Sequence, residues 1–241
     1  MNHHDARHHP PIPLSKLLMP LAALLFASAV ACSLLGARMV LTGSWRQVFL
    51  PWNLFLAWLP LLFAWLAVRA ETSSCAGRWR FRGLALAWLL FFPNAPYILT
   101  DLWHLPPNWQ GRFWTDLVLI LLFALTGLVL GFLSLYLMQS LVARRFGWVH
   151  GWLLACGVAA LSEFGVCIGR FLRWNSWDAL VNPGGLLADL RWCALQMVQS
   201  PRLLALPILF ATLLFVAYVL LYALARMPAA STETRLAAWK P

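Results

Sequence analysis

The 241-residue sequence contains little charge, and acidic side chains are especially scarce. Only 11% of its residues are charged and 62% are apolar, whereas soluble domains average about 25% charged and about 45–50% apolar residues. No soluble fold buries such a surplus of apolar side chains, so the sequence predicts an integral membrane protein. Lysine and arginine exceed the acids enough to give a net charge of +10. Basic loops that orient membrane helices explain this excess without a nucleic-acid partner.

Several motifs that carry chemistry are also missing. The sequence has no glycine-rich phosphate loop, no HExxH zinc pattern and no serine in a triad-like spacing. Its five cysteines show no paired spacing, which argues against a disulfide framework and a cysteine-based metal site. We therefore predict no metal and no cofactor, and the sequence does not favour an enzyme.

What the sequence has instead is long apolar segments. Stretches of about 20 apolar residues are long enough to cross the hydrocarbon core as helices. We predict an all-α transmembrane bundle with one membrane domain over residues 17–225. A disordered His-rich tail precedes it at 1–16, and a second tail follows at 226–241. The six predicted spans are Leu17–Gly36, Phe49–Val68, Leu84–Thr100, Asp116–Met138, Val149–Leu172 and Leu203–Ala225.

Basic residues predict the orientation of these spans. The side that holds both termini carries eleven Lys and Arg, including the run RWRFR at 78–82, and the other side carries seven. The positive-inside rule therefore predicts cytoplasmic termini in a bacterial inner membrane. In the last outer loop, LLADLRWCALQMVQS (186–200) has a helical period but is too short to span. We expect it to form an interfacial helix.

Polar residues gather at the outer ends of the predicted spans. The stretch FFPNAPYILTDLWHL (91–105) breaks the third helix at Pro93 and Pro96, which frees the carbonyls of Leu89 and Phe92. A kinked helix that packs well is one explanation, but Asn94 between the prolines favours a polar pocket. Its amide can bond freed backbone or a ligand. The predicted pocket comprises Asn53, Asn94, Tyr97, Asp101, His104, Glu163, Arg170, Arg173, Asn175 and Asp178.

Asp101 and His104 are spaced to share one helical face. A carboxylate and an imidazole there are able to hold an ion or share a proton, although a solvated helix end with an Asp–His contact is the favoured explanation. Two ligands do not make a metal site. Asp116 follows Thr115 at a helix start, where capping accounts for it without chemistry.

Glu163 lies well inside the fifth span, where an ionisable group needs a partner. Arg170 follows on the same face but about 10 Å further along, too far for direct contact in a straight helix. We therefore expect partners from another helix, with Asn94, Tyr97 and His104 as the candidates. A purely structural ion pair and a functional site both remain open. The opposite face carries Gly165-x-x-x-Gly169, a groove for close helix packing.

Four stretches together resemble a known family. They are NLFLAWLPLLFA (53–64), FFPNAPYILTDLWHL (91–105), WTDLVLILLFALTGLVLGFLSLY (114–136) and FGVCIGRFLRWNSWD (164–178). They resemble the bacterial membrane-protein family catalogued as domain of unknown function 1361, over about residues 50–180 and on to 225. The resemblance implies a polytopic inner-membrane protein and assigns no catalytic roles.

Three functions fit these observations. The first is a membrane protein whose outward-facing pocket binds or processes a lipid-linked or anionic envelope ligand, because interfacial arginines suit phosphate groups. The second is a small proton-coupled transporter, which the broken third helix and Glu163 favour. The third is a structural or assembly protein without a ligand. Lipid is the expected surrounding in all three.

Overall fold

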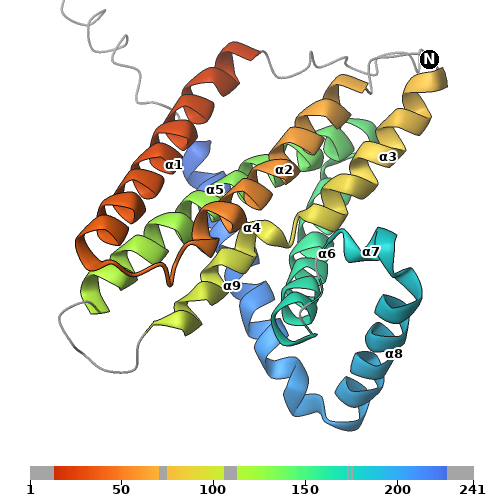
Figure 1. Cartoon of the computed structure of the whole chain (residues 1–241). Coiled ribbons are helices and arrows are strands. Elements are labelled where there is room, and N and C mark those ends of the chain that lie inside the picture. The colour runs from red at the N-terminus through yellow and green to blue at the C-terminus, as the bar shows by residue number, and fades with distance from the viewer. Residues whose placement is uncertain (1–13, 71–74, 106–112, 173, 175, 227–241) are drawn as a thin grey trace, which may run out of the picture.

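The computed structural model describes residues 14–70, 75–105, 113–172, 174 and 176–226, and they form an all-α bundle (Figure 1). Six segments of this described chain are long and apolar enough to span a membrane. The predicted six-span helical fold is therefore confirmed, and the chain is a multi-pass membrane protein. The main helices of the spans are α1 (Leu14–Thr42), α2 (Phe49–Ala70), α3 (Cys75–Phe91), α5 (Phe113–Phe146), α6 (Trp148–Cys167) and α9 (Ala205–Ala225).

Two of the spans change their helical geometry near one end. The third continues from α3 through the short α4 (Asn94–Tyr97) into a 3₁₀-helix, η1 (Ile98–His104), so the predicted proline break is confirmed. The fifth continues from α6 into a π-helical turn, η2 (Ile168–Leu172). Between the fifth and sixth spans lie α7 (Asp178–Val181), α8 (Pro183–Gln199) and the 3₁₀-helix η3 (Pro201–Leu204). Helix α8 matches the helix expected in this loop, and its interfacial position stays a prediction.

Three helices extend well beyond their predicted spans. Helix α1 ends at Thr42 rather than Gly36, α3 begins at Cys75 rather than Leu84, and α5 ends at Phe146 rather than Met138. Hydropathy predicts only the part that lies in hydrocarbon, whereas backbone hydrogen bonding continues a helix into polar surroundings. All three extensions carry arginines. Of the predicted tails, residues 1–13 and 227–241 lie outside the described chain.

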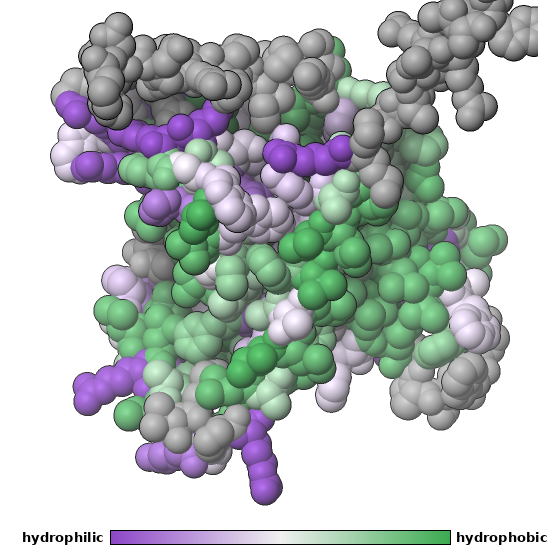
Figure 2. Space-filling view, turned by 180° about the vertical axis from the view of Figure 1, so that it is seen from behind, coloured by the Kyte–Doolittle hydropathy of each residue, from purple (hydrophilic) through white to green (hydrophobic). Residues whose placement is uncertain are grey.

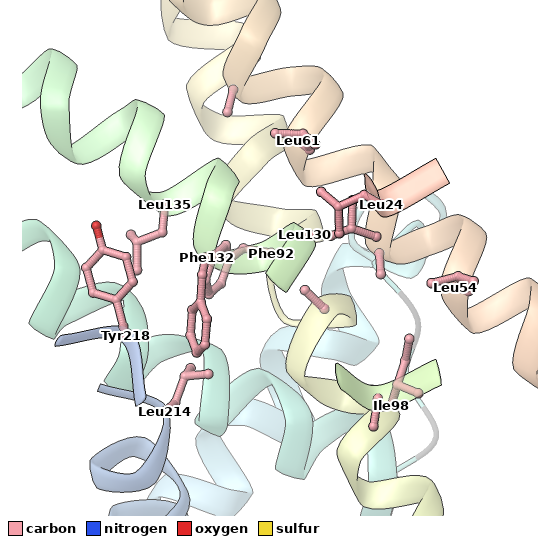
Figure 3. Packing of buried hydrophobic residues seen from close by; sticks show 14 of the residues in the cluster. Leu24, Leu54, Leu61, Phe92, Ile98, Leu130, Phe132, Leu135, Leu214 and Tyr218 are labelled. Atoms are coloured by element: carbon pink, nitrogen blue, oxygen red, sulfur yellow. The ribbon is translucent and has the colours of Figure 1, made fainter. Parts of the chain in front are cut away.

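Helix α5 lies at the centre of the bundle and packs against α1, α2, α4, η1 and α6. Buried side chains from α1, α2, α5 and α9 meet around it, among them Leu24, Leu54, Leu130 and Leu214 (Figure 3). Glycines allow the broken third span to approach closely. A Cβ on Gly131 would lie 2.8 Å from the Ala95 methyl group, and one on Gly127 would lie 3.1 Å from the Ala95 carbonyl oxygen. Small residues in this spacing are typical of tightly packed membrane helices.

The two ends of the bundle differ in composition. Successive spans run in opposite directions (Figure 1), so α1 ends and α2 begins beside η1 and η2. We call this end the Asp101 end. The other end, the arginine end, carries Arg69, Arg78, Arg80, Arg82, Arg144, Arg145 and Arg226. From behind, hydrophilic residues gather at both ends and a hydrophobic belt lies between them, as expected for a membrane-spanning protein (Figure 2).

Candidate functional site

The proline break in the third span is closed by nearby polar groups. Pro96 has no N–H for the Phe92 carbonyl, and the Ala95 N–H donates to that oxygen instead at 3.0 Å. The Asn94 side-chain amide donates to the Phe91 carbonyl oxygen at 2.9 Å and to the Ser176 hydroxyl at 2.9 Å. Asn94 therefore stabilises the break and also ties it to the segment before α7.

A cluster of charged and polar side chains lies just beyond the break. The Asp101 side chain is 1% exposed, yet it reaches partners from three elements. Asn53 of α2 donates to its Oδ2 at 2.8 Å, and Nη1 of Arg170, from the π-turn, lies 3.4 Å from its Oδ1. The Nδ1 atom of His104 lies 3.8 Å from the same Oδ1. A carboxylate buried this deeply needs such partners, because an uncompensated charge inside the protein is costly.

The position of His104 follows from the 3₁₀ geometry of η1. Side chains three residues apart eclipse in a 3₁₀-helix, which brings His104 above Asp101 more directly than an α-helix would. Nη2 of Arg170 lies 3.3 Å from the His104 Nδ1 atom. A guanidinium only donates, so this contact is a hydrogen bond when the imidazole is neutral with its proton on Nε2. Half-exposed His104 then offers the Nε2–H group to a ligand.

These side chains surround a polar cavity of about 520 Å³. Two aromatic residues frame it: Phe49 lies 5.0 Å from the His104 ring, and the Arg170 guanidinium lies 6.0 Å from the Tyr97 ring. Gly169 leaves room beside Tyr97, since a Cβ there would lie 3.4 Å from that ring. The cavity is lined by Phe49, Asn53, Tyr97, Asp101, Trp103, His104, Gly169 and Arg170.

An apolar cleft of about 380 Å³ adjoins the polar cavity. The two spaces share Asn53, Tyr97 and Gly169 in their walls. The cleft lies between α3, α6 and α8, and leucines dominate its lining. Its further lining includes Leu86, Leu90, Leu161, Ser162, Leu186 and Leu190. At the Asp101 end, a charged cavity and an apolar cleft therefore lie side by side.

The structure places two further predicted site residues, Glu163 and Asp178, outside the lining of these two spaces. Glu163 is 3% exposed and lines neither of them, and no hydrogen bond or ion pair joins it to another described side chain. Asp178 lies in the first turn of α7 and also lines neither. Arg173 and Asn175 lie outside the described residues.

The partners expected for Arg170 need a correction. Tyr97 and His104, two of the three candidates, do contact it, but its ionic partner is Asp101, which was not among those candidates. The π-turn explains the difference. It is wider than an α-turn, so it rotates Arg170 out of line with Glu163 and toward the third span.

A second ion pair was missed altogether. Arg38, at the end of α1, binds Asp116 through both carboxylate oxygens, at 2.7 Å and 3.0 Å. Capping had seemed sufficient to explain Asp116. The available signal was an arginine and an acid near the ends of two predicted spans on the same side of the membrane. Among the described residues, no group of three or more His, Cys, Asp or Glu is placed to hold a metal ion.

Comparison with known proteins identifies the family and no activity. No curated protein and no solved structure matches the chain. A family model described as a protein of unknown function (DUF1361) matches residues 52–223. This range includes the described lining residues of the apolar cleft and all those of the polar cavity except Phe49. The match spans well over half of the sequence, and the chain therefore belongs to the DUF1361 family of membrane proteins.

Proposed function

We propose that this membrane protein binds a lipid-linked anionic ligand at the Asp101 end. The observation that carries the proposal is the contact between the polar cavity and the apolar cleft through Asn53, Tyr97 and Gly169. A ligand with a charged headgroup and an apolar chain matches two adjoining spaces of opposite polarity. Their volumes, about 520 Å³ and about 380 Å³, lie in the range of small-molecule sites.

Arg170 is the group best suited to the headgroup. Its guanidinium has five N–H donors, and the contacts with Asp101 and His104 leave others for a ligand. Asp101 holds the guanidinium in place, and arginine binds phosphate in a planar, bidentate geometry. The Nε2–H group of His104 adds a donor beside it. Trp103, which is 86% exposed, lies at the rim of the same cavity.

The apolar cleft is suited to the chain of the ligand. Its walls come from α3 and α6, which span the membrane, and from α8, which covers the same side with Leu186 and Leu190. Leucine side chains offer dispersion contacts without polar groups to desolvate. An acyl or prenyl chain is able to enter here while its headgroup stays at Arg170.

The proposed orientation places this site outside the cytoplasm. The arginine end carries the RWRFR run and both ends of the membrane domain, so the positive-inside rule puts it in the cytoplasm of a bacterial cell. The ligand would then belong to the outer leaflet or the cell envelope. An imidazole beside a carboxylate also suits proton transfer, should the bound ligand be processed.

Matched ligands test the proposal directly. Purified protein in detergent is titrated with geranylgeranyl phosphate and with geranylgeraniol, and tryptophan fluorescence reports binding, since Trp52, Trp103 and Trp174 line the two spaces. We expect the phosphate to bind about tenfold more tightly, because a hydrogen bond to a charged group is worth about 1.5 kcal/mol or more. The variant His104→Ala should reduce this preference, and the side chain is exposed enough for the fold to tolerate its loss.

A second pair of variants tests the cleft. Leu161→Trp should fill the cleft and weaken binding of both ligands. Leu153→Trp is the control, because Leu153 lies on the same helix, is similarly exposed and lines neither space. Equal binding of the phosphate and the alcohol would refute the headgroup site. Unchanged binding in Leu161→Trp would refute the chain site.

A further inference from the structure

A second apolar cleft, of about 720 Å³, lies between α1, α5 and α9, away from the Asp101 end. It shares no lining residue with the two spaces described above. Its volume lies in the range of ligand sites. Residues that define it include Pro20, Ala23, Ala27, Thr126, Tyr136 and Tyr222.

The cleft exists because α1 and α9 pack on different helices. Helix α1 packs against α5, and α9 packs against α6. On α1 the cleft is bordered by Pro20, Ala23 and Ala27, which recur at helical spacing on one face. Such small residues usually let two helices meet, but here they border an open space in the membrane-spanning part of the protein.

Charge in the described lining of this cleft lies at one end. Arg226 lies at the arginine end, with its guanidinium 4.4 Å from the Tyr222 ring, and Tyr136 adds a hydroxyl group nearby. Toward the other end the lining reaches Leu122 and Leu125 of α5 and is apolar except for Thr126, whose hydroxyl donates to the Leu122 carbonyl oxygen. From Leu122 to Tyr136 the helix rises about 21 Å, a large part of the roughly 30 Å hydrocarbon core.

We propose that this cleft binds an anionic phospholipid. An acyl chain lies along Ala23, Ala27 and Leu125, and the phosphate headgroup lies at Arg226. The charge of Arg226 decides between anionic and neutral lipids, since basic residues near the surface attract anionic headgroups. The hydroxyl groups of Tyr136 and Tyr222 add hydrogen-bond donors near Arg226. This lipid belongs to the leaflet at the arginine end, and its site does not depend on the ligand proposed for the Asp101 end.

Native mass spectrometry of the purified chain with two lipids tests the proposal. Dioleoyl phosphatidylglycerol and dioleoyl phosphatidylcholine have the same chains and differ in headgroup charge. We expect the first to bind about fivefold more tightly, the effect of one basic residue at the membrane surface. Arg226→Gln should abolish this preference. The side chain is exposed at the end of α9, so its loss should leave the fold intact.

A pair of variants on α1 tests the position of the acyl chain of the lipid. Ala23→Leu places a larger side chain in the cleft and should weaken binding of both lipids. Ala29→Leu makes the same change at an exposed position of the same helix that does not line the cleft, and it should have no effect. Equal binding of the two lipids to the unaltered chain would overturn the proposal. So would a loss in Arg226→Gln without any loss in Ala23→Leu, because the lipid would then lie outside the cleft.

Discussion

The Arg170 guanidinium lies against the Asp101 carboxylate and not against Glu163 of its own span. Nη1 of Arg170 is 3.4 Å from Oδ1 of Asp101, whose side chain is 1% exposed, while that of Arg170 is 17% exposed. This contact joins the broken end of the third span to the π-turn of the fifth. It therefore connects two segments that depart from α-helical geometry, η1 and η2.

Removing one member of this pair should destabilise the fold. Breaking a buried ion pair costs about 3–5 kcal/mol, and the partial exposure of Arg170 places Arg170→Gln at or below the lower end of that range. The double variant Asp101→Asn/Arg170→Gln should recover much of the loss, since no charge is then left buried alone. Thermal unfolding in detergent measures both. A single variant as stable as the unaltered chain would contradict the ion pair.

The Arg38–Asp116 contact predicts a stabilising link between α1 and α5. Both side chains are largely buried, with Arg38 12% exposed and Asp116 8% exposed, and the contact is bidentate. Arg38→Gln should lower the unfolding free energy by about 2–3 kcal/mol, at or just below the lower end of the range for buried pairs. Arg46→Gln is the matched control, because Arg46 is exposed at the same end of the bundle. Equal effects of the two substitutions would rule out a specific role for the pair.

Close packing at Gly165 predicts sensitivity to a single methyl group. A Cβ there would lie 2.9 Å from Cγ of Pro93, and overpacking of this kind costs about 1–3 kcal/mol. Gly165→Ala should therefore lower the melting temperature. Gly157→Ala, on the same helix, meets nothing within 4 Å and should be neutral or slightly stabilising. If both variants behaved alike, Gly165 would have no role in seating the proline break.

The proposed orientation predicts where reporters are active. A reporter that works only in the periplasm should be silent when fused after Lys240, because the positive-inside rule places that end in the cytoplasm. The same reporter fused after Asn108, between the third and fourth spans, should be active. Activity after Lys240 would overturn the orientation and, with it, the assignment of the Asp101 end to the outside.

Much of the site could be predicted from local sequence features. The proline pair located the break in the third span. The positions of Asn94, Asp101 and His104 near one end of the predicted spans indicated that they lie close together. The ionic partner of Arg170 could not be predicted in the same way. The sequence suggested that Arg170 follows the face of Glu163, but this holds only for a regular α-helix. The π-turn at Ile168–Leu172 changes that register, and the spacing of the residues alone does not reveal it.

The sequence by itself determined the environment and the number of spans, because the cost of placing polar groups in hydrocarbon acts on each segment separately. It also determined the break, since proline lacks an N–H wherever it occurs. Only the tertiary structure decided that Asp101 binds Arg170 and Asn53, that Arg38 binds Asp116, and that a polar cavity meets an apolar cleft. These contacts depend on the rotation and approach of helices far apart in the chain, which are set by packing at positions such as Gly131 and Gly165.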